Sequence, residues 1–580
     1  MRISIFARLK NLLPIVNLFL TSTLVYSQNL EDLKLSKGIE MNGSVNLSTI
    51  GYFVHGIDQR REPFNWFLTG NLNVSLFGYS APFSFSHSNA NTSYAQPFNQ
   101  FAFSPSYKSV KLYLGYNSMT FSPYTLASHV FFGSGIEVSP GNWSIAAMYG
   151  RLRKPVPFNL IDSLQQSNAS YERMGYGLKV GYEKEGSSLS TSFLTAQDDP
   201  RSIPFVVPGS ELKPMENVAI SVAGRKLFFK RFFVDAEYAV SVMNLNTLSN
   251  TNEGDSTAYK QTKNLIRGLL PENATNRYFD ALNSSIGYQG NWYSIQLRYE
   301  RVAPEYQTLG AYYFNNDLQN ITINPTLRVL KNTLQISGNV GLQRNNLNNA
   351  RASTTKRFVG AVNVNYLPNE KWNLTTNYSN FSSFTNMRPQ SDPNFQNNLD
   401  TLNFYQLSET MTAGLVRMFG KKESPKNIMM SISHQTAENA SGYEGGDHPS
   451  DFISTNVAYS QSIVPLNLAI AITANIYTTR AAGTNTTFYG PTASLTKSFF
   501  EKRLRGSLTS SYNKTTGNKI DTGAVLNNRI NVSFAPSKNG NNSSKNNFSL
   551  GINMLRRLRG TESQPSFTEW TGNLNYTFTF

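Results

Sequence analysis

Residues that could carry metal or nucleophilic chemistry are few in this chain. It contains no cysteine, so disulfides and a lipid anchor on cysteine are excluded. Zinc sites and hydrolase triads need histidine near a ligand or a nucleophile, yet no two histidines stand at the spacing of metal ligands on a helix or a strand. The five histidines are His55, His87, His129, His434 and His448. We therefore predict no metal, no cofactor and no enzymatic activity.

Two short motifs are compatible with chemistry but fit a structural role better. Ser134 lies between Gly133 and Gly135 without the Gly-x-Ser-x-Gly pattern of a hydrolase nucleophile, and glycines in a strand indicate close backbone packing. The acidic stretch 444–451 could hold a cation through its carboxylates, but it lacks the regular spacing of a calcium loop and fits a solvated turn. A hydrolase assembled from serine, histidine and asparagine on distant strands would leave no local motif, and it stays open as an alternative.

The elements that must position any site are clearest at the end of the sequence. Between Trp570 and Phe580, large apolar and aromatic residues share one parity, and small or polar residues lie between them, which predicts a strand with one apolar face. The residues on that face are Trp570, Leu574, Tyr576, Phe578 and Phe580. This ending resembles the closing strand of outer-membrane β-barrels. We interpret it as the signal for barrel closure and assembly.

The same alternation recurs along the chain, at the length that crosses a membrane. Apolar and polar residues alternate almost without error over 321–329, 334–342, 358–366 and 466–476. A tilted barrel strand needs about 9 to 11 residues to cross the hydrocarbon core. Because only alternate residues of such a strand face lipid, the low mean hydropathy of −0.35 is compatible with a membrane protein.

Short and long connections take turns between the predicted strands, as in a barrel with short periplasmic turns and longer outer loops. Placing one strand between successive connections gives about 26 strands, within a range of about 24 to 28. The predicted fold is all-β, a single transmembrane antiparallel β-barrel over 38–580 with both termini periplasmic and no separate plug domain. The alternative, a soluble all-β protein, would have strands of about six residues and several domains, but no linker or repeat is visible.

The N-terminal region has the features of an export signal. Basic residues precede an apolar stretch that ends near Val25, which predicts a cleaved signal peptide over 1–27. The apolar stretch is too short to span a membrane as a helix. Residues 28–37 then form a short periplasmic segment, which leaves no room for a folded plug before the barrel.

One stretch of the chain resembles a known group of proteins. Its motifs are Phe103-Ser104-Pro105-Ser106-Tyr107-Lys108, Leu114-Gly115-Tyr116, Phe121-Ser122-Pro123-Tyr124, Phe132-Gly133-Ser134-Gly135-Ile136-Glu137 and Ala147-Met148-Tyr149-Gly150-Arg151. The region 98–200 is similar to outer-membrane barrels of Bacteroidota, and cleavage before Gln28 also resembles exports of that group. Most of these proteins have no assigned activity. The resemblance therefore implies a barrel in the cell outer membrane but no mechanism.

A barrel of this size has a wide interior that must be filled or narrowed. With strands roughly 4.8 Å apart and tilted by about 40°, a circular barrel of about 26 strands would be roughly 50 Å across. We expect inward-folded loops or a partner chain to fill it, and the best loop candidates are 244–274 and 385–400. Two functions stay open. We favour a partner-docking or assembly component that conducts nothing alone over a loop-gated, porin-like channel for small polar solutes.

Basic residues exceed acidic ones, with 52 Lys and Arg, 36 Asp and Glu and a net charge of +16. They scatter among predicted turns and rims, so nucleic acid is not an expected partner. Three are predicted at the outer end of a strand, where they could contact phosphates of outer-membrane lipids and lipopolysaccharide: Arg556, Arg557 and Arg559. Three others are predicted to point into the lumen and could line a path for anions: Arg298, Arg328 and Arg344. Further expected partners are the barrel-assembly machinery and a lipoprotein or surface protein.

Overall fold

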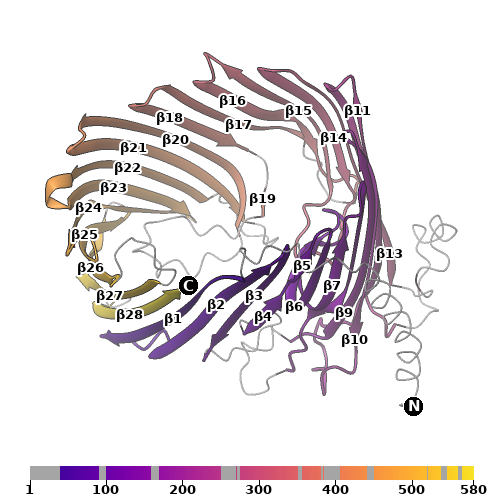
Figure 1. The fold of residues 1–580 in the computed structure, drawn as a ribbon, viewed down its shortest axis with the longest axis horizontal. Coiled ribbons are helices and arrows are strands. Elements are labelled where there is room, and N and C mark those ends of the chain that lie inside the picture. The colour runs from indigo at the N-terminus through magenta and orange to yellow at the C-terminus, as the bar shows by residue number, and fades with distance from the viewer. Residues whose placement is uncertain are drawn as a thin grey trace, which may run out of the picture.

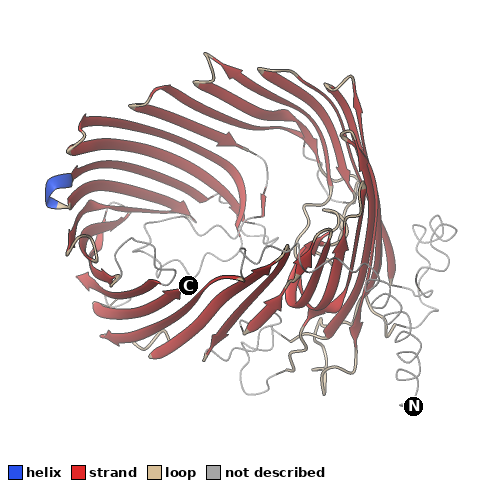
Figure 2. Cartoon of the chain, viewed as in Figure 1, coloured by secondary structure: helices blue, strands red, loops and turns tan. Residues whose placement is uncertain are grey.

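The computed structural model of this chain is dominated by one antiparallel sheet (Figure 1, Figure 2). It describes residues 39–89, 99–158, 169–249, 270, 275–350, 356–380, 383–384, 405–439, 450–481, 483–518, 520–536, 545–558 and 565–580. Within these ranges the helical structure is a 3-10 turn at Val464–Leu466. No helix in the described part of the chain is both long and apolar enough to cross a membrane.

The strands are numbered in chain order, and most pair with the strands before and after them along the chain. Their bounds are β1 Glu40–His55, β2 Phe64–Leu76, β3 Tyr79–Ser88, β4 Gln100–Phe103, β5 Ser106–Tyr107, β6 Val110–Thr120, β7 Ala127–Val138, β8 Trp143–Arg153, β9 Glu172–Lys184, β10 Ser187–Asp199, β11 Glu216–Phe228, β12 Phe232–Asn244, β13 Asn276–Gln289, β14 Tyr293–Val302, β15 Leu318–Val329, β16 Leu334–Arg344, β17 Lys356–Asn369, β18 Trp372–Ser379, β19 Ser383–Phe384, β20 Tyr405–Lys421, β21 Ser424–Asn439, β22 Ser450–Ile463, β23 Leu468–Ala481, β24 Thr484–Phe499, β25 Leu504–Gly517, β26 Ile520–Phe534, β27 Lys545–Leu558 and β28 Phe567–Thr579.

The 28 strand segments make 26 crossings of the wall, as predicted, because two crossings are each built from two segments. β4 and β5 both pair with β3 on one side and with β6 on the other. Pro105 separates them, since proline has no amide hydrogen for the strand ladder. In the same way, β18 and β19 both pair with β20.

The first and last strands pair with each other and close the barrel, as predicted (Figure 1). Backbone hydrogen bonds join Phe580 N to Gly43 O at 3.0 Å and Gly43 N to Phe580 O at 2.9 Å. Glycine is required at position 43, because a Cβ there would lie 2.4 Å from the Asn71 carbonyl oxygen. Since β1 also pairs with β2, and β28 with β27, this seam presents no unpaired strand edge.

β1 begins and β28 ends at the same rim of the barrel, which also carries tight turns between strands. The pairs Phe77–Gly78 and Glu185–Gly186 both have positive φ at each position, the geometry of hairpin turns that match strand twist. The opposite rim carries longer connections, such as 154–171 and 303–317. Short and long connections therefore lie at opposite rims.

The two faces of the wall differ in chemistry, with a period of two residues. On β28, Trp570 and Leu574 point outward with exposed fractions of 43% and 52%. Tyr576 and Phe578 share this face, and the Phe578 ring lies 5.5 Å from that of Phe580. The residues between them point inward and are polar. The outer face is therefore apolar over much of the barrel, and the inner face is where a functional site must be sought.

Candidate functional site

The inner face of β6 to β14 carries a large apolar cluster, in contrast to the polar inner face of most other strands. We call this region the packed half. Its wall contributes buried side chains from many strands, including Phe131, Met148, Leu152, Leu194, Ala219, Ala239, Met243, Phe279, Ala281 and Val302. A barrel wall alone cannot bury such residues, because its inner face borders the lumen. Other segments must therefore cover them.

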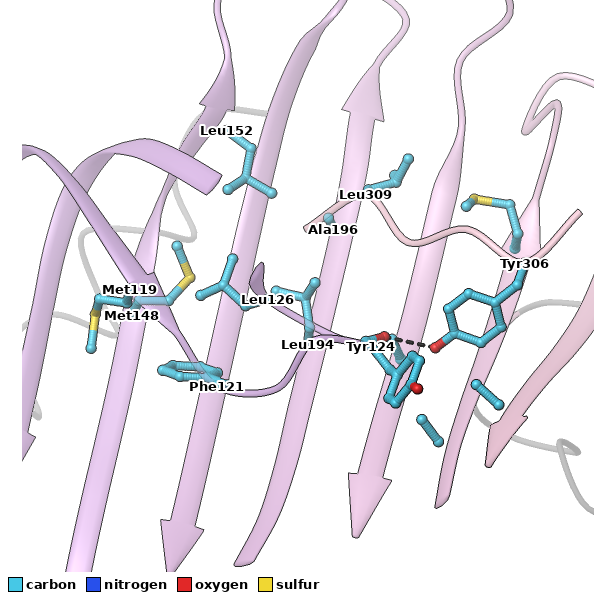
Figure 3. Close-up of a cluster of buried hydrophobic side chains, with 14 of the residues drawn as sticks. Met119, Phe121, Tyr124, Leu126, Met148, Leu152, Leu194, Ala196, Tyr306 and Leu309 are labelled. Atoms are coloured by element: carbon cyan, nitrogen blue, oxygen red, sulfur yellow. Dashed lines mark hydrogen bonds between the residues drawn. The ribbon is translucent and has the colours of Figure 1, made fainter. Parts of the chain in front are cut away.

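Two connections fold into the lumen and provide that cover. They are residues 121–126, between β6 and β7, and residues 303–317, between β14 and β15; we call the pair the shelf. The Tyr306 hydroxyl donates a hydrogen bond to the Tyr124 carbonyl oxygen at 2.7 Å (Figure 3), and Ala127 N donates to Gly310 O at 3.0 Å. Tyr306 is completely buried. The two connections thus form one body, although they lie far apart in the sequence.

Hydroxyl and amide side chains fasten the shelf to the wall. Thr125 Oγ1 lies 2.9 Å from Ser192 Oγ on β10. The Asn217 carboxamide oxygen on β11 accepts hydrogen bonds from Thr308 Oγ1 at 2.9 Å and from Leu309 N at 3.1 Å, and its nitrogen donates to Ser241 Oγ at 2.8 Å. Asn217 is fully buried. Since a buried polar group is costly when its partners are removed, these contacts favour a fixed position of the shelf.

Glycines in the wall and in the shelf make room for this packing. A Cβ on Gly177 would lie 2.6 Å from the Phe121 ring, and a Cβ on Gly135 would lie 2.7 Å from the Met119 sulfur. A Cβ on Gly310 would lie 2.2 Å from Leu194 Cδ2. Each glycine is therefore needed for close approach. Gly135 belongs to the glycine–serine–glycine motif that the sequence predicted to serve packing.

The two connections of the shelf are not the ones that the sequence singled out, although Leu245 of the predicted loop 244–274 packs against the same apolar cluster. The predicted loops 244–274 and 385–400 lie largely or wholly outside the described residues. The stretch 303–317 is recognisable as a long connection, but 121–126 is too short to be noticed by length. Its signal is composition, because Phe121, Tyr124 and Leu126 are unusually apolar for an exposed connection.

A row of charged and polar side chains lies on the inner face of the wall, between the shelf and the tight-turn rim. Strand register places five inward side chains side by side on β10 to β14: Ser188, Arg225, Asp235, Ser285 and Arg298. We call this set the charged row. The next level holds Glu237 and Glu300, and both contact the shelf, since Ser122 donates to Glu237 and the Tyr124 hydroxyl donates to Glu300 at 3.2 Å.

The side chains of the charged row contact one another without being enclosed. Arg225 Nε lies 3.6 Å from Asp235 Oδ1, and their side chains are 45% and 32% exposed. Ser285 Oγ donates to Asp235 Oδ2 at 3.1 Å. Arg298 donates to Asn283 at 3.0 Å and to Glu300 at 3.3 Å. The row lines a cavity of about 340 Å³ that is open to the lumen.

The phenols of the shelf stay protonated at ordinary pH. Burial raises the pKa of the Tyr306 hydroxyl, and burial together with the nearby Glu300 carboxylate raises the pKa of the Tyr124 hydroxyl. Both groups lie in the inserted connections and both donate hydrogen bonds. Neither of these two hydroxyls would therefore lose its proton and weaken these bonds near neutral pH.

The three arginines predicted to line the lumen divide between the two faces. Arg298 lies on the inner face in the charged row, and Arg328 shares the inward parity of Thr322 on β15. Arg344 lies on the outer face instead, beside the exposed residues Leu342 and Phe358. Arg344 has the same parity on β16 as Leu342, so the strand period of two directs it outward.

The three arginines predicted to contact lipid phosphates divide in the same way. Arg556 is exposed and shares the outward parity of Ile552 on β27. Arg557 points inward, because it has the parity of Leu555, which is buried in an inner-face cluster with Val525 and Phe567. The position of Arg557 therefore does not suit a contact with lipid. Arg559 lies outside the described residues.

The inner face of β21 to β28 has a different composition, and we call it the polar half. Its inward residues are mainly small and polar: Asn427, Ser431, Ser433, Ser454, Asn456, Ser460, Thr473, Asn475, Thr492, Ser494, Thr509, Ser511, Asn531, Ser549, Asn573 and Asn575. Many bond across strands, such as Ser460 to Asn427 at 2.8 Å and Tyr477 to Asn456 at 3.0 Å. Most of these side chains remain partly exposed to the lumen. Over the described residues, this half offers mainly uncharged hydrogen-bonding groups, with Arg505, Arg529 and Glu569 among the inward side chains.

Groups for metal chemistry do not gather in the described residues, where no set of three or more His, Asp or Glu side chains could hold a metal ion. Of the histidines, His129 lies in the packed half with its ring stacked on Tyr312 at 4.1 Å, and His434 lies 3.6 Å from Asp451 on β22. His87 packs against Trp66 at 5.5 Å. These histidines contact different parts of the wall and do not form a site together.

Comparisons with known proteins give only distant likenesses. No family model and no curated protein matches this chain. The translocation pore of the P pilus usher PapC is 11% identical, with a TM-score of 0.37, over 93% of this chain and 99% of the usher chain. A mutant of the ferric enterobactin receptor PfeA from Pseudomonas aeruginosa is 11% identical, with a TM-score of 0.39, over 94% of this chain and 81% of the receptor. The outer membrane protein OpdK from Pseudomonas aeruginosa is 9% identical, with a TM-score of 0.28, over 69% of this chain and 99% of OpdK. At these scores none of them carries a functional inference for this chain.

Proposed function

We propose that this chain is an integral outer-membrane β-barrel that forms an aqueous channel for small polar solutes. The observation that carries the proposal is the division of the inner face. One half is covered by a packed shelf, and the other half exposes serine, threonine and asparagine side chains to the lumen. A wall of this kind offers hydrogen bonds to polar solutes without binding them strongly.

Placement in a membrane is supported by the pairing of backbone groups in the closed wall and by the apolar side chains on its outer face. In hydrocarbon every backbone polar group needs a partner within the protein, and a closed barrel meets that condition. The outer face exposes large apolar side chains on successive strands, such as Ile472 at 54%, Leu495 at 45% and Leu550 at 45%. In water, such an extended apolar surface would cause aggregation. We therefore place the barrel wall in lipid.

Aromatic residues near the tight-turn rim support the same placement. Trp143 and Tyr182 lie 5.1 Å apart there, and Phe548 and Tyr576 lie 4.8 Å apart. Arginine and lysine stack on further rings at this rim, including Arg417 over Trp372 at 4.9 Å and Lys497 over Phe499 at 5.3 Å. Aromatic belts with flanking cations are typical of the interface between lipid and water.

The shelf supports a channel with a fixed narrowing, and it does not support a gate formed by the same segments. Moving residues 121–126 and 303–317 away from the wall would expose the apolar cluster and break the hydrogen bonds of Asn217. Burial of one large apolar side chain contributes about 1.5 to 3 kcal/mol, and several would be exposed together. We therefore propose that the shelf stays in place while solutes pass along the polar half.

Single-channel recording of the detergent-purified full chain in planar bilayers tests this function. A fixed shelf beside a polar lumen predicts steady currents without voltage-dependent closure, and liposomes that carry the protein should admit small neutral sugars. Silence in the bilayer, with uptake no greater than in protein-free liposomes, would contradict the channel.

A second candidate is a partner-docking or assembly component, with the lumen filled by a partner. The partly exposed amides and hydroxyls on the polar half favour it, because an inserted chain could form hydrogen bonds with them. Outer-membrane lipids and lipopolysaccharide would surround either version, with Arg556 available for phosphate, and the barrel-assembly machinery would insert it. Co-purification of a lipoprotein or surface protein, together with silent bilayers, would favour this candidate over the channel.

Export with a cleaved signal is proposed on sequence grounds alone, since residues 1–38 lie outside the described part of the chain. Cleavage after Ser27 predicts that the protein recovered from outer membranes begins at Gln28, which N-terminal sequencing or intact mass would establish. The resemblance to barrels of Bacteroidota belongs to the same proposal. Recovery from the soluble fraction would contradict the membrane location.

A further inference from the structure

We infer that the charged row is a binding site for a small solute that carries a carboxylate next to a hydrogen-bond donor, either an ammonium or a hydroxyl group. The inference rests on the proposed channel function and names the class of solute that would pass. It starts from the cavity of about 340 Å³ on β10 to β14, which is large enough for a molecule the size of an amino acid or a dipeptide.

Arg225 presents unused donors to this cavity. In the described part of the chain its guanidinium contacts Asp235 at 3.6 Å, longer than a hydrogen bond, and stacks on the Phe233 ring at 4.7 Å. The side chain is 45% exposed. Stacking fixes the plane of the guanidinium without using its N–H groups, so the group is oriented for a planar acceptor such as a carboxylate.

The charges that line the cavity balance each other, which favours a ligand that carries both an acceptor and a donor. The row holds Arg225 and Arg298 with Asp235 between them in strand order. Glu237 and Glu300, at the next level, are already hydrogen-bonded to the shelf. Glu237 also lines the cavity, and Arg298 is paired with Glu300 at 3.3 Å, so Arg225 and Asp235 are the charged pair that a ligand with both a carboxylate and a hydrogen-bond donor can engage.

Asp235 supplies the second half of the recognition. Its Oδ2 accepts a hydrogen bond from Ser285 at 3.1 Å, and among the described residues its Oδ1 is held only by the 3.6 Å contact with Arg225. The side chain is 32% exposed, so a ligand donor can reach it. A carboxylate on Arg225 with a neighbouring ammonium or hydroxyl on Asp235 would satisfy both groups at once.

The polar side chains of Ser188, Ser190, Asn283 and Gln296 and the Glu237 carboxylate also line the cavity. They can donate to or accept from the rest of a polar ligand. The shelf closes the side toward the longer connections, since Ser122 and Tyr124 contact the acids of the next level. The site is thus a recess at the foot of the shelf, open to the lumen and lined on several strands by polar groups.

Calorimetric titration of the detergent-purified full chain tests this inference with defined probes. Glycylglycine offers a carboxylate and an ammonium, glycolate a carboxylate and a hydroxyl, acetate a carboxylate alone, and ethanolamine no carboxylate. We expect glycylglycine or glycolate to bind at least about tenfold more tightly than acetate, with no binding of ethanolamine. Whichever of the first two binds more tightly identifies the donor as ammonium or hydroxyl.

Substitutions locate the binding. Arg225→Gln should weaken the preferred probe by about tenfold or more, whereas Arg328→Gln, an inward arginine outside the cavity, should leave it within about twofold. The double variant Arg225→Gln with Asp235→Asn leaves no unpaired carboxylate in the row, so it controls for an effect on folding. It should bind the preferred probe no more tightly than Arg225→Gln. Heat-modifiable migration in gels confirms the folded barrel in each variant.

Equal binding by the wild type and Arg225→Gln, acetate binding as tightly as the preferred probe, or no binding of any probe would overturn the inference. Its failure is distinguishable from failure of the proposed channel. Currents without probe binding would leave the channel in place and remove the site, whereas probe binding without currents would leave the site and remove the channel.

Discussion

The packed half and the polar half of this barrel are built from strands with the same backbone pairing but have opposite interiors. On β10 to β13 the inner face carries alanine, serine and leucine under a shelf that is pinned by Asn217. On β21 to β28 the inner face carries asparagine, serine and threonine in partly exposed positions. The difference shows that wall and interior are determined separately. The alternation of apolar and polar residues determines the strands of the wall. Small inward residues and the two inserted connections determine what fills the lumen.

The seam is common to both halves and should show the largest effect. Deleting Tyr576 to Phe580 removes the register of β28 with Val45 and Leu47 on β1 and the hydrogen bonds of Phe580 to Gly43. With a strand edge left open, we expect no assembled barrel, measured as loss of the protein from outer-membrane fractions. Normal accumulation of the truncated protein would show that closure does not depend on this strand end.

Gly310 in the shelf and Gly506 on the outer face of β25 form a matched pair. A Cβ on Gly310 would meet Leu194 at 2.2 Å, whereas a Cβ on Gly506 would meet no atom within 4 Å. Gly310→Val should destabilise the barrel by about 1 to 3 kcal/mol or more through overpacking, and Gly506→Val should have little effect. Thermal unfolding followed by gel migration measures both. Equal shifts would mean that the shelf is packed no more tightly than the open outer face of the wall.

Much of the fold could be predicted from the sequence, because each strand carries its own local signal. The alternation of Trp570, Leu574 and Tyr576 determines both the strand and its outward face, and counting such strands leads to 26 crossings. The shelf was missed because its partners are not local. Nothing near Thr125 in the sequence indicates that Ser192 lies beside it, since only barrel closure and register bring them together.

The arginines illustrate where sequence reasoning about faces succeeds and where it does not. Arg298 alternates with outward residues such as Leu297 and lies on the inner face. Arg344 was wrongly assigned, although it has the parity of Leu342 on the same strand. Arg225 belongs to the charged row, which depends on register across several strands and so could not be read from one segment.

Removal of one hydroxyl gives a smaller contrast between the halves. Tyr306→Phe deletes a buried hydrogen bond of 2.7 Å to the Tyr124 carbonyl, and Tyr477→Phe deletes one of 3.0 Å to Asn456 in the polar half. The first should cost about 1 to 3 kcal/mol, because the carbonyl is left buried without its partner. The second should cost about 1 kcal/mol or less, since lumen water can replace it. Equal costs would contradict the difference in burial.

Charge placed on the polar half should change selectivity with little change in stability. Ser494→Lys adds a cation to an inward position on β24, in a recess that Lys426 also lines and in register with Arg529 two strands away. We expect the reversal potential in a salt gradient to shift toward anions, while thermal unfolding changes by about 0.5 kcal/mol or less. Leu495→Lys, on the outward face of the same strand, is the control for selectivity. A similar reversal potential in both variants would show that solutes do not pass along this wall.

The most direct test of the central claim is to lock the shelf to the wall and record the current. The chain has no cysteine, and Thr125 Oγ1 lies 2.9 Å from Ser192 Oγ, so Thr125→Cys with Ser192→Cys places two thiols within reach of a disulfide. A fixed shelf beside an open polar path predicts the same single-channel conductance with the disulfide oxidised and reduced. Loss of current on oxidation, restored by reduction, would show that the shelf is a gate and contradict this account.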